Sequence, residues 1–208
     1  SEGGQQTDMR CIFCGREKQK ESPVSFFLEE DPLCTECRKQ LKRHKRVVTV
    51  EGMKVLTFYD YEGLYRSLLI QYKECYDEAL KDVFLYELND FINFRYCGYS
   101  LALVPGSRKK REERGFDHLE LMCRKIRLKR LEGLRMKEEQ IQEGRSAAQR
   151  EKMKDNYIYE GKRMNRVLIL DDVMTTGSTL LGIYRALENK ADHIRVLSLA
   201  YKSKGLHY

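Results

Sequence analysis

Apolar residues along this chain recur with two periods, one typical of strands and one typical of helices. Three short apolar segments predict buried strands, at 99–104, 167–170 and 194–201. Segments with apolar residues at helical spacing predict helices, at 62–72, 77–91, 116–131 and 180–187. Residues 47–59 alternate around Glu51-Gly52, which predicts a hairpin. Strands that alternate with helices indicate an α/β fold with a parallel sheet flanked by helices.

The strand at 167–170 continues into DDVMTTGST, the most informative stretch of the chain. Asp171 and Asp172 follow the apolar run, at the end of a parallel strand where open α/β sheets bind ligands. The turn after them is rich in hydroxyls and glycine, and it leads into the positive end of a helix. Two carboxylates can accept hydrogen bonds from vicinal hydroxyls while such a turn holds a phosphate. We therefore predict a ribose 5-phosphate site, with the phosphate on Thr175, Thr176, Gly177, Ser178 and Thr179.

This stretch resembles a known signature. All positions of 167–179 fit the phosphoribosyl-pyrophosphate motif of type I phosphoribosyltransferases, in the expected order of strand, loop and helix. The resemblance implies a type I phosphoribosyltransferase-like domain that binds phosphoribosyl pyrophosphate with Mg²⁺. The alternative is an ordinary strand end of a doubly wound sheet, for example one with a magnesium-binding aspartate pair.

Two C-x2-C pairs near the start predict a metal site. Cys11 and Cys14 form the first pair, and Cys34 and Cys37 form the second. Two such pairs with this separation are typical of one tetrahedral Zn²⁺ site of the structural kind, because four thiolates leave no open coordination position. Disulfides are the rival interpretation, and a reducing compartment disfavours them.

We expect three parts along the chain. Residues 1–8 are interpreted as the remnant of an expression tag, with Met9 as the native start. Residues 9–46 form a zinc ribbon with a basic tail, and residues 47–208 form the phosphoribosyltransferase-like domain. Residues 134–161 are polar and highly charged, so a mobile loop or hairpin is expected there.

The formal net charge of +7 is concentrated in one region. Residues 104–166 contain nineteen Lys or Arg and eleven Asp or Glu, a net charge of +8. Within them, a set of polar and basic residues is predicted to bind pyrophosphate or DNA phosphates: Ser107, Arg108, Lys109, Arg111, Arg114 and Arg150. The tail 38–46 is basic as well, and it is either a nucleic-acid contact or a solvated helix.

Nearly the whole chain resembles the ComF family of DNA-uptake (competence) proteins. The resemblance is carried, in order, by the four-cysteine ribbon, Tyr59, Gly63, Arg66, Tyr72-Lys73, Val104–Ser107, Arg114–Phe116, Ser146, Arg150 and the DDVMTTGST turn. The chain departs from the family at Asp117 and His118, where Asn-Gln is usual, and at Met153, where Asn is usual.

The resemblance implies a role in natural transformation, with single-stranded DNA and a membrane-associated helicase-like ATPase as partners. We expect a cytoplasmic protein that reaches the inner face of the membrane only through partners, because no apolar run approaches the ~18 residues of a membrane span. The sequence contains no motif that reads bases, so DNA binding is expected to depend on salt rather than on sequence.

Three hypotheses follow. The first, which we favour, is a competence protein that retains a phosphoribosyl pyrophosphate site. The second is an active phosphoribosyltransferase in which Asp171 and Asp172 hold the ribose and Arg108 holds the departing pyrophosphate; no acceptor site is evident and no catalytic residue is assigned. The third is a nucleic-acid regulator on the same scaffold, which would need a DNA-reading element such as a helix-turn-helix.

Overall fold

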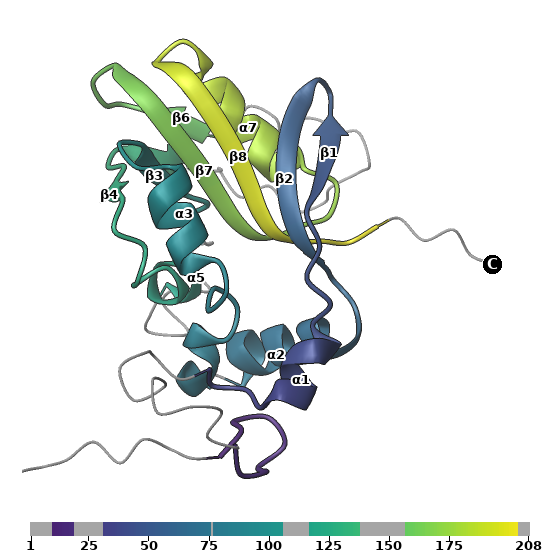
Figure 1. Cartoon of the computed structure of the whole chain (residues 1–208). Coiled ribbons are helices and arrows are strands. Elements are labelled where there is room, and N and C mark those ends of the chain that lie inside the picture. Colours follow the sequence, from purple (N-terminus) through teal and green to yellow (C-terminus); the bar gives the residue numbers. More distant parts are fainter. Residues whose placement is uncertain (1–9, 19–30, 76, 106–116, 138–156, 204–208) are drawn as a thin grey trace, which may run out of the picture.

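The fold is built around a six-stranded sheet (Figure 1). The computed structural model describes residues 10–18, 31–75, 77–105, 117–137 and 157–203. The strands, in their order across the sheet, are β1 (Arg46–Val50), β2 (Met53–Asp60), β8 (Ala191–Tyr201), β7 (Met164–Met174), β3 (Ser100–Leu103) and β4 (Lys129–Arg130). All neighbouring pairs are parallel except β1 and β2, which form the predicted hairpin. The predicted α/β fold with a parallel sheet is confirmed.

The two longest strands, β7 and β8, occupy the middle of the sheet. Residues Val167–Leu170 of β7 are fully buried, as expected for a parallel strand covered on both faces. Leu168 and Leu170 pack into the core on one face, and Val167 and Ile169 pack into the core on the other. The strand does not end before the aspartates but continues through them to Met174. Asp171 and Asp172 therefore keep the alternation of a strand and point to opposite faces.

Helices cover both faces of this sheet. Helix α7 (Ser178–Glu188) lies behind the sheet in Figure 1 and buries four apolar side chains against it: Leu180, Leu181, Ile183 and Leu187. Helices α2 (Gly63–Glu74), α3 (Asn89–Arg95) and α5 (His118–Met122) contribute to the larger core on the opposite face.

Two predicted helices are shorter than their apolar spacing suggested. In place of one helix over 77–91, the chain forms a 3-10 helix (η2, Glu78–Asp82), then turns, and then α3. The predicted helix at 116–131 is reduced to α5, and the chain then reaches β4. In the polar segment, β5 (Leu134–Met136) pairs antiparallel with β6 (Tyr157–Tyr159), which agrees with the expected hairpin. Residues 138–156 lie outside the described residues.

The cysteine-rich segment packs directly against the main body. Helix α1 (Thr35–Gln40) follows the second cysteine pair, and Cys11, Leu33, Cys37 and Leu41 belong to the same buried cluster as the core of the sheet. The predicted boundary at Arg46–Val47 coincides with the start of β1. The two expected parts therefore share one hydrophobic core.

Candidate functional site

The turn between β7 and α7 forms one wall of a small cavity. Thr175–Thr179 and Asp171 line this cavity of about 30 Å³. Gly177 has a φ of +79°, and an added Cβ would lie 2.9 Å from Val50 Cγ2. A side chain at this position would be strained and would collide with β1. The tight turn therefore depends on glycine.

The same turn presents hydrogen-bond donors to the cavity. Helix α7 begins at Ser178, and the backbone N–H groups of a first helical turn lack partners within the helix. Their dipoles give this end a partial positive charge. Beside them, the hydroxyl oxygens of Thr176 and Ser178 lie 2.6 Å apart. The structure thus brings the five predicted phosphate-binding residues together in an arrangement that suits an anion.

The two aspartates differ in their surroundings. Asp171 is partly exposed and lines the cavity beside the turn. Asp172 is 4% exposed, and its Oδ2 lies 2.6 Å from Lys73 Nζ and 2.7 Å from His118 Nε2. Asp172 is therefore held by Lys73 and His118 on its face of the sheet, whereas Asp171 lines the cavity at the turn on the other face.

These surroundings move the two pKa values apart. Burial, followed by the charge of Asp172, raises the pKa of Asp171 to about 8, although Lys73 acts in the opposite direction. Burial alone would raise the pKa of Asp172, but the charge of Lys73 and the hydrogen bond from His118 hold it well below its usual range. Asp172 is therefore the carboxyl group of the pair that ionises first, and Asp171 holds its proton to a higher pH than an ordinary aspartate.

The residues that depart from the family pattern have definite positions. Asp117 is the N-cap of α5, where its Oδ1 accepts hydrogen bonds from the backbone N–H groups of Leu119 and Glu120. His118 holds Asp172, and its carbonyl oxygen accepts a hydrogen bond of 2.8 Å from the Tyr72 hydroxyl. The role of His118 in fixing Asp172 could not be predicted, because a lone histidine carries no spacing signal.

The predicted basic loop lies outside the described residues. This applies to Ser107, Arg108, Lys109, Arg111, Arg114 and Arg150, and also to Met153. Their binding to pyrophosphate or DNA phosphates stays a prediction.

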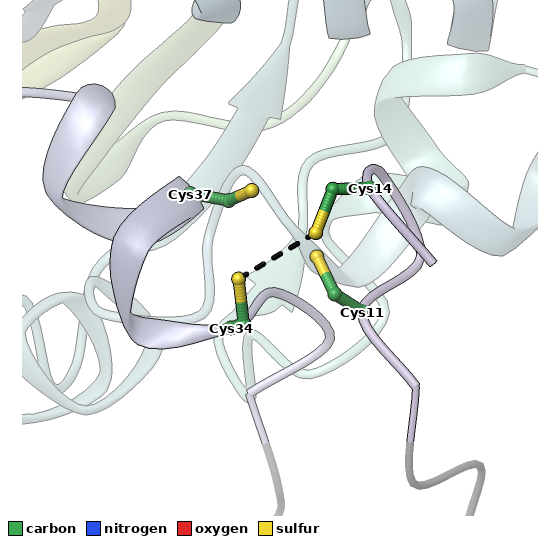
Figure 2. Close-up of side chains that lie close together, drawn as sticks. All are labelled: Cys11, Cys14, Cys34 and Cys37. Atoms are coloured by element: carbon green, nitrogen blue, oxygen red, sulfur yellow. Dashed lines mark hydrogen bonds between the residues drawn. The ribbon is translucent and has the colours of Figure 1, made fainter. Parts of the chain in front are cut away.

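The four cysteines of the two C-x2-C pairs converge on one point (Figure 2). Their sulfur atoms all lie within 4.8 Å of one another, and the sulfurs of Cys14 and Cys34 are 3.7 Å apart. Tetrahedral coordination with metal–sulfur bonds of about 2.3 Å requires sulfur separations of about 3.8 Å. All four are free thiols, so this donor set could hold a metal ion such as Zn²⁺.

Crowding of the sulfurs affects their ionisation. At Cys11, burial is outweighed by backbone hydrogen bonds at Cys14, Cys34 and Phe13, which lower its pKa to about 6. At Cys37, burial and the neighbouring sulfurs raise the pKa. The thiol of Cys11 therefore ionises readily, whereas that of Cys37 resists ionisation.

The basic tail that follows the cysteines is engaged within the protein. Arg38 bonds to Asp31 through Nε at 2.7 Å and Nη2 at 2.5 Å, and its Nη1 donates to the carbonyl of Val83 at 3.0 Å. Arg43 lies 4.0 Å from Glu87, and Arg46 lies 3.3 Å from Asp60. These contacts favour a structural role for Arg38, Arg43 and Arg46 over a nucleic-acid contact. Lys45 differs from them, because its Nζ lies over the ring of Phe91.

Comparison with known proteins finds a curated relative that matches nearly the whole chain. The competence protein ComFC of Streptococcus pneumoniae (strain ATCC BAA-255 / R6) is 22% identical over 219 residues, which cover 92% of this chain and 99% of that protein. This chain is ComFC-like, with similarity along nearly the full length of both proteins. No protein-family model matches the ComFC-like chain.

Among solved structures, a hypoxanthine phosphoribosyltransferase from Staphylococcus aureus is similar to the ComFC-like chain. The TM-score is 0.39 at 18% identity, and the match covers 61% of this chain and 65% of that one, just under two thirds of its length. Within the described residues of the ComFC-like chain, every helix is too short or too polar to cross a membrane.

Proposed function

We propose that this protein supports DNA uptake in natural transformation and retains a binding site for phosphoribosyl pyrophosphate. The observation that carries the proposal is the similarity to ComFC along nearly the full length of both chains. In this role the protein acts in the cytoplasm, at the inner face of the membrane, on incoming single-stranded DNA together with a helicase-like ATPase.

A deletion strain tests the competence role. Transformation frequency is expected to fall strongly while binding of labelled duplex DNA to the cell surface stays normal. Normal transformation in the deletion strain would refute the proposal. Restoration by the wild-type gene, and not by one with a premature stop codon, controls for effects on neighbouring genes.

The sugar-phosphate site is supported by the turn cavity. Thr175–Thr179 would bind the 5-phosphate with hydroxyls and backbone N–H groups, and Asp171 would bind a ribose hydroxyl. Asp172 would support the site indirectly and would not bind the ligand itself, because Lys73 and His118 already contact its Oδ2. Mg²⁺, bound with the pyrophosphate, would neutralise the ligand's charge.

Calorimetric titration of Mg²⁺–phosphoribosyl pyrophosphate tests this site. Binding to the wild-type protein is expected to weaken about two- to tenfold in Asp171→Asn, because the amide has one acceptor oxygen fewer and a net hydrogen bond between neutral groups is worth about 0.5–1.5 kcal/mol. Asp192→Asn is the matched control, since Asp192 is an exposed carboxylate paired with Arg163. Equal binding by wild type and Asp171→Asn would show that the turn is only a scaffold.

At the cysteine cluster we propose structural Zn²⁺. Four sulfur donors at tetrahedral separations suit this ion, and they leave no position for substrate. Metal analysis of the purified protein is expected to give about one zinc per chain. Cys37→Ser is expected to lose the zinc, whereas Cys97→Ser, an exposed cysteine outside the cluster, is expected to retain it.

Phosphoribosyl transfer is the alternative predicted from the sequence. The proton on Asp171 favours this activity, because a carboxyl group with a pKa of about 8 can exchange protons with a ligand at neutral pH. Release of pyrophosphate in the presence of a nucleobase or amine acceptor would establish it. If phosphoribosyl pyrophosphate binds but no common base causes release of pyrophosphate, transfer activity is refuted and only the binding role stands.

A further inference from the structure

A second, larger cavity is lined by none of the residues of the phosphate turn. Its volume is about 530 Å³, within the range of ligand-binding clefts. Lys54 near the start of β2 and Arg195 in the first half of β8 both line it, and α3 forms its side wall. In Figure 1 these strands begin at the upper edge of the sheet and run toward its lower end, where β7 also ends. The cavity is therefore at the amino-terminal end of the parallel strands.

The lining of this cavity is cationic. Lys45, Lys54, Arg95 and Arg195 line it, all four are exposed, and no acidic side chain lines it within the described part of the chain. Arg43 and Arg46, on either side of Lys45 in sequence, are paired with acids. Among the described residues, no carboxylate forms an ion pair with any of the four lining cations. Their charges are therefore available to an anionic ligand.

Aromatic rings lie beneath two of these cations. Lys45 Nζ lies 5.4 Å from the ring centroid of Phe91, and the Arg95 guanidinium lies 5.7 Å from that of Tyr96. The two rings contact each other edge to face, with centroids 6.3 Å apart. This packing orders two flexible side chains at the rim of the cavity. A ligand thus meets cations that are already positioned.

The row of rings and cations continues beyond the cavity. Tyr99 contacts Tyr96 with a centroid separation of 5.5 Å, and the Arg166 guanidinium lies 5.8 Å from the Tyr99 ring. On α3, Phe94 is 89% exposed, and Val47 on β1 is 59% exposed and lines the cavity. Exposed apolar groups among aligned cations suit a polyanion that also carries flat, apolar faces.

We propose that this cationic groove binds single-stranded nucleic acid along its sugar-phosphate backbone. Non-selective single-strand sites combine a positive groove that follows the phosphates with apolar and aromatic groups on which bases stack. The spread of Lys45, Lys54, Arg95 and Arg195 over two strands, a helix and the segment before β1 favours an extended ligand over a single small anion. The inference deepens the proposed function, on which it rests, by assigning the surface that takes the DNA.

Fluorescence anisotropy with labelled oligothymidine of about 20 nucleotides tests the groove. Each phosphate contact changes the slope of log affinity against log salt by about 0.7 for single strands. The double variant Lys54→Gln/Arg195→Gln is therefore expected to lower the slope by about 1.4 and to weaken binding about 25-fold near 0.1 M salt. A duplex of the same length is expected to bind more weakly than the single strand.

The control removes the same charge elsewhere. Lys129→Gln/Arg163→Gln changes one exposed cation on β4, at the other edge of the sheet, and one that is paired with Asp192. It is expected to bind like the wild type. Equal losses in both double variants, no loss in either, or equal binding of duplex would overturn the groove assignment while DNA binding itself stands. Failure of the wild-type protein to bind any single strand would refute both the groove and the DNA role in the proposed function.

Discussion

Asp171 is expected to lower the stability of the folded protein at neutral pH. Burial and the charge of Asp172 raise its pKa to about 8, whereas an aspartate in an unfolded chain has a pKa of about 3.9. Between these values the unfolded chain has released the proton and the folded protein still holds it. The free energy of unfolding must therefore fall as the pH rises through this range. Replacing Asp171 with a neutral residue removes this loss.

The magnitude follows from the two pKa values. Each unit of difference corresponds to about 1.4 kcal/mol, so the loss near pH 7.5 is at most about 5 kcal/mol. In Asp171→Asn, the retained Oδ1 can still accept the hydrogen bond of 2.9 Å from the backbone N–H of Asp172. The new amide NH₂ group has to find a partner, which costs about 1–3 kcal/mol. We expect a net gain of about 2–4 kcal/mol near pH 7.5 that disappears near pH 4.

Urea unfolding followed by circular dichroism between about pH 4 and 8 measures this gain. The control Asp192→Asn changes an exposed carboxylate, and its effect should stay within about 0.5 kcal/mol at every pH. A variant Asp171→Asn that is no more stable than the wild type near neutral pH would refute the reasoning. A gain that is the same at all pH values would do so too, because it could not come from ionisation.

Three further predictions concern the ion pair of Asp172, the glycine of the phosphate turn and the cysteine cluster. Lys73→Met leaves the buried carboxylate of Asp172 with one partner fewer, and the free energy of unfolding in urea should fall by about 3 kcal/mol. The double variant Lys73→Met/Asp172→Asn should regain most of this stability, because it has no buried carboxylate at position 172. Gly177→Ala should cost at least about 1–2 kcal/mol from the left-handed backbone alone, and Val50→Ala in the same chain should relieve the collision but not that cost, as thermal unfolding would show. Removal of metal with a chelator should make the four ribbon thiols reactive toward a thiol reagent and lower the melting temperature, and added Zn²⁺ should reverse both effects.

The elements predicted correctly from the sequence are those with long or unambiguous patterns. The uninterrupted apolar run at 167–170 is typical of a parallel strand buried on both faces. Glu51 and Gly52 supply the two residues with positive φ that a tight hairpin turn needs. The two cysteine pairs were recognisable because their spacing reflects the geometry of coordination. In each case one local interaction determines the structure.

The predictions that failed depended on tertiary contacts. Leu80 and Leu88 are buried as their helical spacing implies, but the chain reaches those positions through a 3-10 helix and turns. Around 123–130, Arg130 donates hydrogen bonds to the carbonyls of Cys123, Ile126 and Leu128, which satisfies groups that a continuous helix would have paired internally. Apolar spacing indicates which side chains are buried, but it does not show whether the backbone between them forms a continuous α-helix or a 3-10 helix and turns.

The candidate site was predicted only as far as contiguous residues define it. The turn and its glycine were evident, but the separation of the two aspartates depends on Lys73 and His118, which come from α2 and α5. The cationic groove is assembled from four segments, so no local pattern could indicate it.

The order of strands has a consequence for synthesis of the protein on the ribosome. Strand β8 comes last among the described strands, yet it lies between β2 and β7 and joins the two parts of the sheet. Until residues 191–201 have left the exit tunnel, β2 and β7 each present an unpaired edge, and the core that contains the ribbon cysteines lacks Leu197 and Leu199. A nascent or truncated chain that stops before β8 should therefore be aggregation-prone and in need of chaperones, even when its ribbon has already bound metal.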